Sequence, residues 1–286
     1  MKVALAVCST TIDGVPDTPI LRAAVEAAGH DVRLLDWCDA PAWDWPELTL
    51  LHTPWDYAQK LSAFLSWLER VSARSILLNR AELVRASLHK AYLLDLQRAG
   101  IAIPQTLLLQ RGAAPDPQQL RDAFGASPVV VKPAVGSGGR RLERLDNVAA
   151  LLASNIMGSA AIAGEDLLVQ RYEATIETRG EFSLVVIDGS PSHLVHKRPR
   201  QGEYRVQERH GGANGPVDID DTARGMAASL APFMTDALYA RIDYLVDAGG
   251  GPLLMELELA EPDLSLGYAP EAARRLAVGL TRRGIG

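Results

Sequence analysis

Cysteine is scarce in this chain of 286 residues, which contains only Cys8 and Cys38. Two thiols cannot build a disulfide scaffold for a chain of this length, so the class of small disulfide-rich secreted folds is excluded. We expect two buried or half-buried thiols in a reducing compartment. With 48% hydrophobic and 22% charged residues, the composition is that of a globular protein with an apolar core, and it excludes disorder as the main state.

Excess positive charge and long apolar runs are also absent. The chain has 29 Lys+Arg against 35 Asp+Glu, a net charge of −6 with histidine neutral, which argues against broad nucleic-acid binding. No stretch approaches the roughly 20 apolar residues that span a bilayer. The apolar run at residues 3–7 is too short for a signal peptide. We therefore expect a cytoplasmic protein that binds neither nucleic acid nor membrane.

The first part of the chain alternates short apolar runs with helical patterns. The runs predict strands buried on both faces, and the amphipathic segments between them predict helices. The strands are expected at 3–7, 32–35, 48–52 and 76–78, and the helices at 20–28 and 64–71. This order predicts an open α/β domain, which binds ligands beyond the carboxyl ends of its strands. Trp55, Asp56 and Tyr57 follow the third strand, so substrate contact and simple packing are both open for them.

Later segments predict a long helix, two single strands and two hairpins. The helix is expected at 88–99, the strands at 128–132 and 167–170, and the hairpins at 181–197 and 239–259. Asp188-Gly189 is a favourable turn pair for the first hairpin. Three consecutive glycines at 249–251 mark the turn of the second.

The second hairpin gives the sharpest physical argument for a site. With its turn centred between residues 249 and 250, Asp243 lies opposite Glu256. Arg241 then lies opposite Glu258, and all four side chains share one face. Directly opposed side chains have Cβ atoms about 5 Å apart, so these carboxylates repel one another and are costly to bury unpaired. A Mg²⁺ ion bound through carboxylate and phosphate oxygens resolves the conflict; a solvated acidic face paired with Arg241 is the alternative.

A glycine-rich stretch follows the strand that ends in Lys132. Residues 136–139 read Gly-Ser-Gly-Gly, and glycines let backbone N–H groups approach phosphate oxygens while the lysine adds a positive charge. The stretch is no P-loop, because it lacks Gly-Lys-Ser/Thr, and Arg141 replaces the last glycine of a dinucleotide fingerprint. A flexible turn is the alternative. A basic loop lies further along the chain, and it either binds phosphate or is a solvated charged loop. Its cations are Lys197, Arg198, Arg200, Arg205 and Arg209.

Together these features resemble the ATP-grasp superfamily over residues 90–266. The resemblance rests on their order: a lysine, a second lysine with a glycine-rich loop, a strand, a hairpin, and then Asp243 followed by Glu256-x-Glu258. The usual final pattern is Glu-x-Asn, and Glu258 replaces the asparagine. The resemblance implies an α/β fold, α+β in its second half, with ATP-grasp architecture. It places an open α/β domain on the substrate side at 1–85, a central ATP-clamping subdomain at 86–175, and a C-terminal one with the metal hairpin at 176–286.

The resemblance also implies a role for each matching residue. Those that bind ATP are Lys90, Lys132, the lid residues Gly136, Ser137, Gly138 and Gly139, the adenine hinge Gln170, Arg171 and Tyr172, and Glu173 near the ribose. Those that stabilise the transferred phosphoryl group and the acyl-phosphate are Lys197, Arg205 and Arg241. Those that hold two Mg²⁺ ions are Asp243, Glu256 and Glu258. Those that contact substrate are Trp55, Asp56, Tyr57 and Ser265.

Several phrases are most similar to the branch that contains glutathione synthetase and the RimK-like ligases. They are Arg179-Gly-Glu-Phe-Ser183, His196-Lys-Arg-Pro199, Tyr204-Arg-Val-Gln207, His210-Gly-Gly212, Met255-Glu-Leu-Glu-Leu-Ala-Glu-Pro262 and Trp55-Asp-Tyr57. Within this branch they most resemble cyclo-ligases that activate the carboxylate of O-ureido-D-serine with ATP and close it to the isoxazolidinone ring of D-cycloserine. The resemblance implies an ADP-forming C–N ligase that uses ATP and Mg²⁺ on a small amino-acid-like substrate; a homodimer stays open.

Two alternative functions remain. One is an intermolecular ligase of the glutathione synthetase or RimK type, which joins a carboxylate to an amine. The other is a sensor that binds ATP without turnover. The intact set of Lys132, Arg241, Asp243 and Glu256 argues against the sensor, because a sensor could lose its metal ligands.

Overall fold

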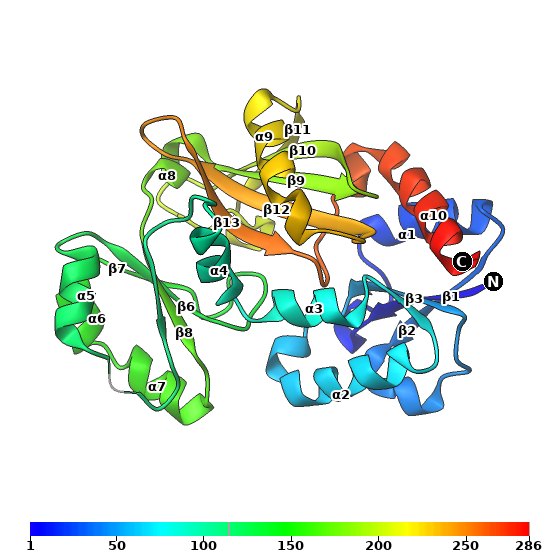
Figure 1. The fold of residues 1–286 in the computed structure, drawn as a ribbon, viewed down its shortest axis with the longest axis horizontal. Coiled ribbons are helices and arrows are strands. Elements are labelled where there is room, and N and C mark those ends of the chain that lie inside the picture. Colours follow the sequence, from blue (N-terminus) through cyan, green and yellow to red (C-terminus); the bar gives the residue numbers. More distant parts are fainter. Residues whose placement is uncertain (114, 286) are drawn as a thin grey trace.

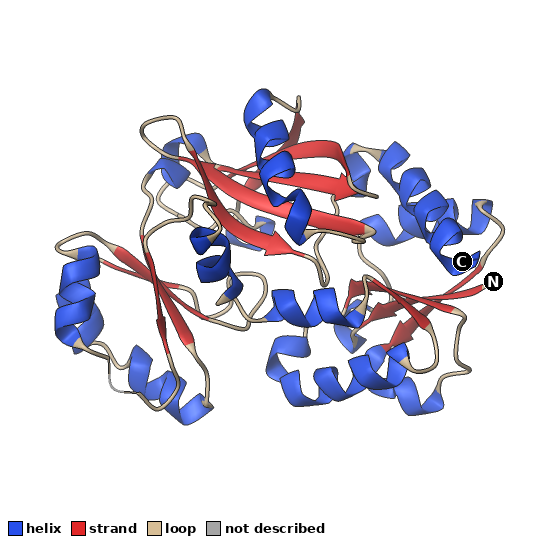
Figure 2. Cartoon of the chain, in the orientation of Figure 1, coloured by secondary structure: helices blue, strands red, loops and turns tan. Residues whose placement is uncertain are grey.

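The computed structural model describes residues 1–113 and 115–285, and its elements gather around three sheets that follow one another along the chain (Figures 1 and 2). One sheet lies within each of the segments 1–85, 86–175 and 176–286. Across the described chain, no helix is both long and apolar enough to cross a membrane. Both cysteines are free; Cys8 is buried as expected, whereas Cys38 is exposed.

The N-terminal sheet is parallel throughout. Its elements are β1 (Lys2–Val7), α1 (Asp17–Ala27), β2 (Asp31–Asp36), β3 (Leu48–Thr53), α2 (Leu61–Ser72), β4 (Ile76–Leu78) and α3 (Ala81–Leu88). The strand order is β2-β1-β3-β4. Strand β1 is buried on both faces, because Leu5 packs toward Leu21 of α1 while Ala6 packs toward Phe64 of α2. The predicted open α/β domain is confirmed.

The central sheet is antiparallel and has the order β5-β8-β6-β7. Its elements are α4 (Tyr92–Arg98), β5 (Thr106–Leu109), α5 (Pro117–Phe124), β6 (Val129–Pro133), β7 (Glu143–Leu145), α6 (Val148–Ala153), α7 (Ile156–Ala163) and β8 (Leu167–Arg171). Leu120 and Phe124 of α5 pack with Val131 of β6 in one buried cluster. The strands β6 and β8 lie close to the predicted bounds.

The single helix predicted at 88–99 is wrong. The chain forms α3, breaks at residues 89–91, and starts again at α4. The break has a clear cause, since His89 is extended and the Lys90 N–H donates to the Ala134 carbonyl at 2.8 Å. A helix pattern cannot reveal this tertiary bond. The break matters because it directs the Lys90 side chain toward the loop that follows β6.

The C-terminal sheet is antiparallel, in the order β11-β10-β9-β12-β13. Its elements are α8 (Thr175–Arg179), β9 (Glu181–Ile187), β10 (Ser190–Arg198), β11 (Ala213–Val217), α9 (Asp221–Leu230), β12 (Tyr239–Val246) and β13 (Pro252–Glu258). Both predicted hairpins are confirmed. Asp188 and Gly189 have φ of 53° and 75°, as a two-residue I′ turn requires.

The last helix, α10 (Pro270–Ile285), returns to the beginning of the chain. Leu276 and Leu280 share a buried cluster with Leu21 and Val25 of α1 and with Ile187 of β9. Figure 1 shows α10 beside α1, with both termini at this end of the molecule. The C-terminal sheet is thereby fastened to the N-terminal domain, which holds the two sides of the site in register.

Candidate functional site

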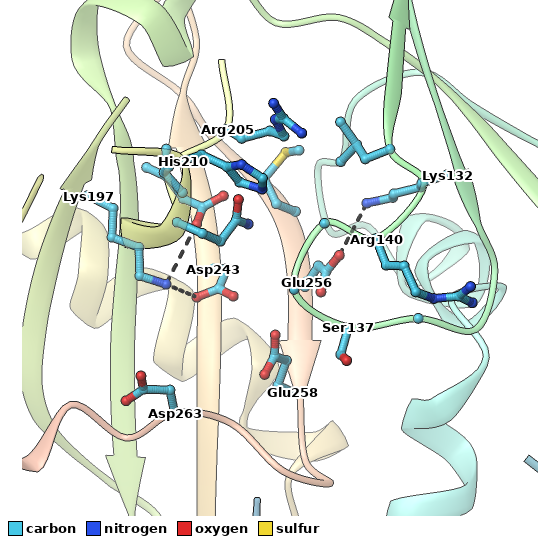
Figure 3. Close-up of a pocket in the computed structure, with 18 of the residues that line it drawn as sticks. Lys132, Ser137, Arg140, Lys197, Arg205, His210, Asp243, Glu256, Glu258 and Asp263 are labelled. Carbon is cyan, nitrogen blue, oxygen red and sulfur yellow. Dashed lines mark hydrogen bonds and ion pairs between the residues drawn. The ribbon is translucent and has the colours of Figure 1, made fainter. Parts of the chain in front are cut away.

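A cavity of about 950 Å³ is lined by residues of all three parts of the chain. Strands β9, β12 and β13 contribute acidic and basic side chains, and the loop at 136–142 faces them (Figure 3). Val15, Asp17 and Trp55 contribute from the N-terminal domain. The site therefore lies at the carboxyl ends of the N-terminal strands, where an open α/β domain is expected to bind ligands.

The β12–β13 register agrees with the prediction at the acidic residues. Asp243 pairs with Glu256, and Arg241 pairs with Glu258. The turn, however, is centred on Gly249, since the Asp247 N–H donates to the Gly251 carbonyl. Tyr244 pairs with Leu254, so Met255 is an extra residue on β13 that restores the expected register. The bulge at Met255 is the difference between the predicted and the observed hairpin.

Arg241 holds this acidic face together. Its Nε donates to Asp243 Oδ1 at 2.9 Å, and its Nη2 donates to Glu258 Oε1 at 2.6 Å. Burial would raise the pKa of Asp243, but Arg241 and Lys197 outweigh it and hold that pKa well below its ordinary value. Burial raises the pKa of Glu258 to about 7; Arg241 opposes the shift, and Asp243 and Glu256 add to it. The carboxylates thus differ in their readiness to hold a proton.

Two lysines converge on Glu256 from the other side of the cavity. Lys132 Nζ lies 3.3 Å from Glu256 Oε1, and Lys90 Nζ lies 3.5 Å from Oε2. Burial would raise the pKa of Glu256, but the two lysines outweigh it and keep that pKa lowered. Burial lowers the pKa of Lys132. Two cations sharing one carboxylate leave positive charge for a further anion, and phosphate oxygens are suitable acceptors.

Lys197 on β10 joins the hairpin to a residue that sequence reasoning missed. Its Nζ lies 3.9 Å from Asp243 and 3.8 Å from Glu181 (Figure 3 labels Lys197 and Asp243). Burial, reinforced by Asp243, raises the pKa of Glu181 to about 7, with Lys197 and Arg241 opposing. Glu181 is the first residue of β9, which pairs with β12 of the acidic hairpin, and a carboxylate at the end of an apolar strand is the signal that could have found it.

The acidic side chains of the β12–β13 hairpin are candidate ligands for Mg²⁺. Among the described residues, no three carboxylate, imidazole or thiolate side chains form a group that could hold a metal ion alone. Asp243, Glu256 and Glu258 nevertheless point into the same space from one face of the hairpin (Figure 3). Hard carboxylate oxygens suit Mg²⁺, which completes its shell with water and substrate phosphates. The residues present fit an ion that enters together with a nucleotide.

Two hydrogen bonds fasten the glycine-rich loop. Lys90 Nζ donates to the Gly136 carbonyl at 2.8 Å, and Ser137 Oγ donates to the Trp55 carbonyl at 3.3 Å. Gly138 has a φ of +60°, and a Cβ there would meet Arg209 Nη2 at 2.5 Å. Glycine is therefore favoured at 138 for its backbone conformation, and a side chain there would displace the Arg209 guanidinium. The fastening to Trp55 links the loop to the N-terminal domain.

Arg205 lies on the loop that carries Arg209 and lines the cavity. Its Nη2 lies 2.7 Å from Glu203 Oε2. Hydrogen bonding to Arg205 lowers the pKa of Glu203 to about 2, which keeps the pair ionic. The predicted contact between Arg205 and a transferred phosphoryl group therefore requires Arg205 to exchange partners.

The predicted hinge residues Gln170, Arg171 and Tyr172 line the cavity, as does Glu173, which is predicted to lie near the ribose. The side chain of Gln170 is occupied, because its Nε2 donates to Thr106 Oγ1 at 2.9 Å. The N–H groups of Arg171 and Tyr172 donate to the carbonyls of residues 105 and 128. Across the described chain, the Glu173 N–H has no hydrogen-bond partner. Backbone recognition of a base is thus left to that N–H and to carbonyl groups.

Trp55 and Asp56 separate at the end of β3. Trp55 lines the cavity, and its Nε1 donates to the Glu261 carbonyl at 3.1 Å. Asp56 instead accepts from Trp37 Nε1 at 2.7 Å and from Lys60 Nζ at 2.6 Å. Both oxygens of Asp56 are therefore engaged outside the cavity. The predicted substrate contact of Asp56 has no support in this geometry.

Tyr57 also lies outside the cavity lining. It is buried against Phe64, with ring centroids 5.1 Å apart, and its hydroxyl faces Glu261. Packing is therefore its observed role, because apolar contacts surround its ring. Ser265 does line the cavity; its N–H donates to Asp263 Oδ1 at 2.8 Å, and its φ is +51°.

Three further carboxylates line the cavity beside the N-terminal domain: Asp17, Glu261 and Asp263. Burial, together with Asp263, raises the pKa of Asp17 to about 6. Burial, together with Glu258, raises the pKa of Glu261 to about 8. Sequence reasoning missed all three. Asp17 follows β1, so the rule that ligands gather at strand ends could have found it; spacing alone offered no signal for the other two.

The sequence matches the models of two protein families. Residues 89–266 match the RimK-like ATP-grasp domain, and residues 3–79 match the N-terminal domain of D-cycloserine synthetase DcsG. The ATP-grasp match covers more than half of the chain and includes the lysines, the glycine-rich loop and the acidic hairpin. The N-terminal match ends just after β4.

Comparison with individual proteins also finds similarity to ATP-grasp ligases. The cycloserine biosynthesis protein DcsG of Streptomyces lavendulae is 30% identical over 281 residues, which is 93% of each chain. The glutathione synthetase of Mesorhizobium japonicum is 25% identical over 59% of this chain and 51% of its own. A crystal structure of D-cycloserine synthetase DcsG superposes with a TM-score of 0.89, at 28% identity, over 99% of this chain and 100% of its own. A Bacillus anthracis D-alanine–D-alanine ligase complexed with ATP shares the fold, with a TM-score of 0.66 at 14% identity, over 100% of this chain and 97% of its own.

Proposed function

Because this chain belongs to the RimK-like ATP-grasp family and is an ATP-grasp ligase, we propose that it closes O-ureido-D-serine to D-cycloserine with ATP. The observation that carries the proposal is the similarity to a cycloserine biosynthesis protein over 93% of both chains. The match at 3–79 is the more discriminating part, since that domain borders the substrate side of the cavity. The ATP-grasp part is shared with ligases for other acids.

Nucleotide binding is proposed to replace the ion pairs seen around Glu256. Lys90 and Lys132 turn from this carboxylate to the phosphates, and the backbone N–H groups of residues 136–139 close over them. The release of Lys90 from the Gly136 carbonyl frees the loop to move with the nucleotide. The free N–H of Glu173 and neighbouring carbonyls bind the adenine edge. In these exchanges the lysines that now pair with Glu256 become the partners of the phosphates, so the charged residues already in the cavity are sufficient to bind the nucleotide.

Asp243, Glu256 and Glu258 are proposed to hold two Mg²⁺ ions together with the phosphates. When bound, Mg²⁺ supplies charge neutralisation at the β- and γ-phosphates. The protein's task is to orient the reactants and exclude water. Lys197 and Arg241 direct the substrate carboxylate toward the γ-phosphorus. Arg205 separates from Glu203 and then stabilises the transferred phosphoryl group.

The bond changes are those of acyl-phosphate chemistry. The substrate carboxylate attacks the γ-phosphoryl group, which releases ADP and leaves an acyl-phosphate. The nitrogen bonded to the side-chain oxygen of the same substrate then attacks the acyl carbon, loses its proton and displaces phosphate. Water cleaves the bond from this nitrogen to the carbamoyl group, which leaves as CO₂ and ammonia, so that the free ring is D-cycloserine. Since the nucleophile is part of the activated acid, no added amine is required. The family resemblance and two free thiols also support a cytoplasmic, reducing location.

Coupled measurement of ADP and ring product tests the proposal. The chain is incubated with O-ureido-D-serine, ATP and Mg²⁺, with and without an added amine. We expect one ADP per isoxazolidinone with no amine present, and loss of both products in Lys132→Met. ADP release that requires the amine would identify an intermolecular ligase. ATP binding with no acid-dependent ADP release would identify a sensor.

A further inference from the structure

The cavity has two ends that differ in how their carboxylates are partnered. At the hairpin end, Asp243, Glu256 and Glu258 each have a lysine or arginine nitrogen within 4.0 Å. At the N-terminal end, Asp17 and Asp263 line the same cavity. Within residues 1–113 and 115–285, no lysine, arginine or histidine nitrogen lies within 4.0 Å of either carboxylate. Asp17 is buried and Asp263 is exposed, so the two carboxylates meet at this end with no cation in direct contact.

Asp17 is held rigidly in this position. It is only 8% exposed, at the first turn of α1. Its donors are the backbone N–H groups of Leu266 and Gly267, the latter at 3.4 Å from Oδ1, and neither carries a net charge. Asp263 acts on it through its charge and through a hydrogen bond. A buried carboxylate held beside another is costly unless a cation joins them.

The nearby cation, Arg241, acts on Asp263 through its charge, but its side chain donates to Asp243 and Glu258. His52 is bonded to Thr18 Oγ1 at 2.8 Å, and burial lowers its pKa to about 4, so it is neutral at working pH. The next buried cavity carboxyl is Glu261, which is 7% exposed and also has no cationic nitrogen within 4.0 Å in the described chain. A guest cation is therefore the missing partner at this end.

We propose that Asp17 and Asp263 bind the α-ammonium group of the amino-acid substrate. The geometry orients the whole zwitterion, because Arg241 Nη1 donates to the backbone carbonyl of Asp263 at 3.1 Å. An ammonium held by the two aspartates therefore lies next to the guanidinium that directs the reacting carboxylate. The inference deepens the proposed function and rests on its amino-acid substrate. It gives a substrate contact to Asp17, which the sequence did not single out, in place of Asp56, which it did.

A pair of ligands tests the site on the intact enzyme. Binding of O-ureido-D-serine and of its analogue without the α-amino group is measured by calorimetry in wild type, Asp17→Asn and Asp263→Asn. We expect each variant to weaken the amino acid about 10- to 100-fold, as for loss of a charged hydrogen bond, and to leave the des-amino acid unchanged. Asp13→Asn, an exposed carboxylate outside the cavity, is the matched control and leaves both affinities unchanged.

Stability separates a binding role from a structural one. The folded state raises the pKa of Asp17, so its ionised form opposes folding above about pH 6, and Asp17→Asn should raise the melting temperature at pH 7. Weaker amino-acid binding in a more stable variant is the expected combination. Equal loss of both ligands, or unchanged binding of the amino acid, overturns the proposal. If no ring forms but another amino acid stimulates ADP release, the same comparison is made with that amino acid. Weaker binding of that amino acid to Asp17→Asn then supports the ammonium subsite, while the closure reaction is rejected.

Discussion

The two ends of the cavity partner their carboxylates in opposite ways. At the hairpin end every carboxylate already has a cation from the protein, so ligand binding must exchange one ion pair for another. At the N-terminal end Asp17 and Asp263 have no protein cation within 4.0 Å in the described residues, so binding adds a partner. The first arrangement preserves a stable fold without nucleotide. The second selects for a cationic group on the substrate.

This difference explains how one scaffold can serve several acids. The hairpin end belongs to the ATP-grasp match at 89–266, whereas Asp17 lies in the match at 3–79. Chemistry common to the family is thus built from paired charges on β12 and β13. We expect selectivity to come from the other end of the cavity, where Asp17 of the N-terminal domain meets Asp263 of the ATP-grasp part. Changes at the first end should reduce turnover, and changes at the second should change substrate affinity.

The largest expected effect comes from Glu256→Gln. Turnover with saturating ATP and Mg²⁺ should fall by roughly 100- to 1,000-fold, as when an electrostatic contact to the reacting group is removed. The variant should also be less stable without Mg²⁺, by roughly 3 kcal/mol, because Lys90 and Lys132 lose their buried counter-ion. Steady-state kinetics and urea unfolding measure the two effects.

The stability result discriminates between two accounts of the hairpin. Carboxylate repulsion, as expected from the sequence alone, would make Glu256→Gln more stable than wild type. Glu82→Gln, exposed on α3, is the control for loss of a surface charge. Normal Mg²⁺-dependent turnover in Glu256→Gln would reject the metal role of this residue.

Acid pH should weaken substrate binding through Asp17. Its raised pKa of about 6 means that it is ionised at pH 7 and mostly protonated at pH 5. Since only the ionised form attracts an ammonium, the KM for the amino acid should rise about tenfold between these values. The charged group that acts on Asp17 is Asp263, and Asp263 in turn interacts with neutral His52 and with Arg241. Asp17→Asn should flatten this profile, while the KM for ATP serves as the internal reference; a wild-type KM independent of pH in this range contradicts the prediction.

Local pattern predicted the hairpin end well. Alternation along β12 and β13 placed Arg241, Asp243, Glu256 and Glu258 on one face, and the structure has that pairing. The bulge at Met255 could not be predicted, because two short turns with different centres fit the same three glycines. The ion pairs of Lys90 and Lys132 with Glu256 could not be predicted either, because they depend on how the central sheet packs against the C-terminal sheet.

The N-terminal end was predicted less well for a physical reason. Its contacts join loops far apart in the sequence, as Asp17 and Gly267 show. The correct rule, that ligands bind at strand ends, leaves a choice among all loops at that edge. Asp56 was chosen because it follows β3 directly, but Trp37 and Lys60 occupy it. Only tertiary packing reveals which carboxylate faces the cavity.

A smaller effect is expected at the loop that joins the two ends. Gly138→Ala puts a side chain on a residue with φ of +60°, where a Cβ also meets Arg209. Such a conformation costs about 1–2 kcal/mol, so the closed loop should be less populated and the KM for ATP about fivefold higher. Gly136→Ala, whose Cβ meets only Pro133 at 3.9 Å, should have a smaller effect. Limited proteolysis at 136–141 with and without an ATP analogue provides the second readout, and equal cleavage in both states contradicts closure on nucleotide.

The smallest expected effect on activity is that of Asp56→Asn, which is the matched opposite of Asp17→Asn. Asparagine still accepts from Trp37 Nε1 but loses the charge that pairs with half-exposed Lys60. Unfolding should become easier by about 1 kcal/mol, while the KM for the amino acid stays at its wild-type value. Asp17→Asn should do the reverse, with higher stability and weaker substrate binding. Thermal unfolding and steady-state kinetics on the two variants therefore separate the carboxylate that supports the fold from the one that receives the substrate; a raised KM in Asp56→Asn would return Asp56 to the binding site.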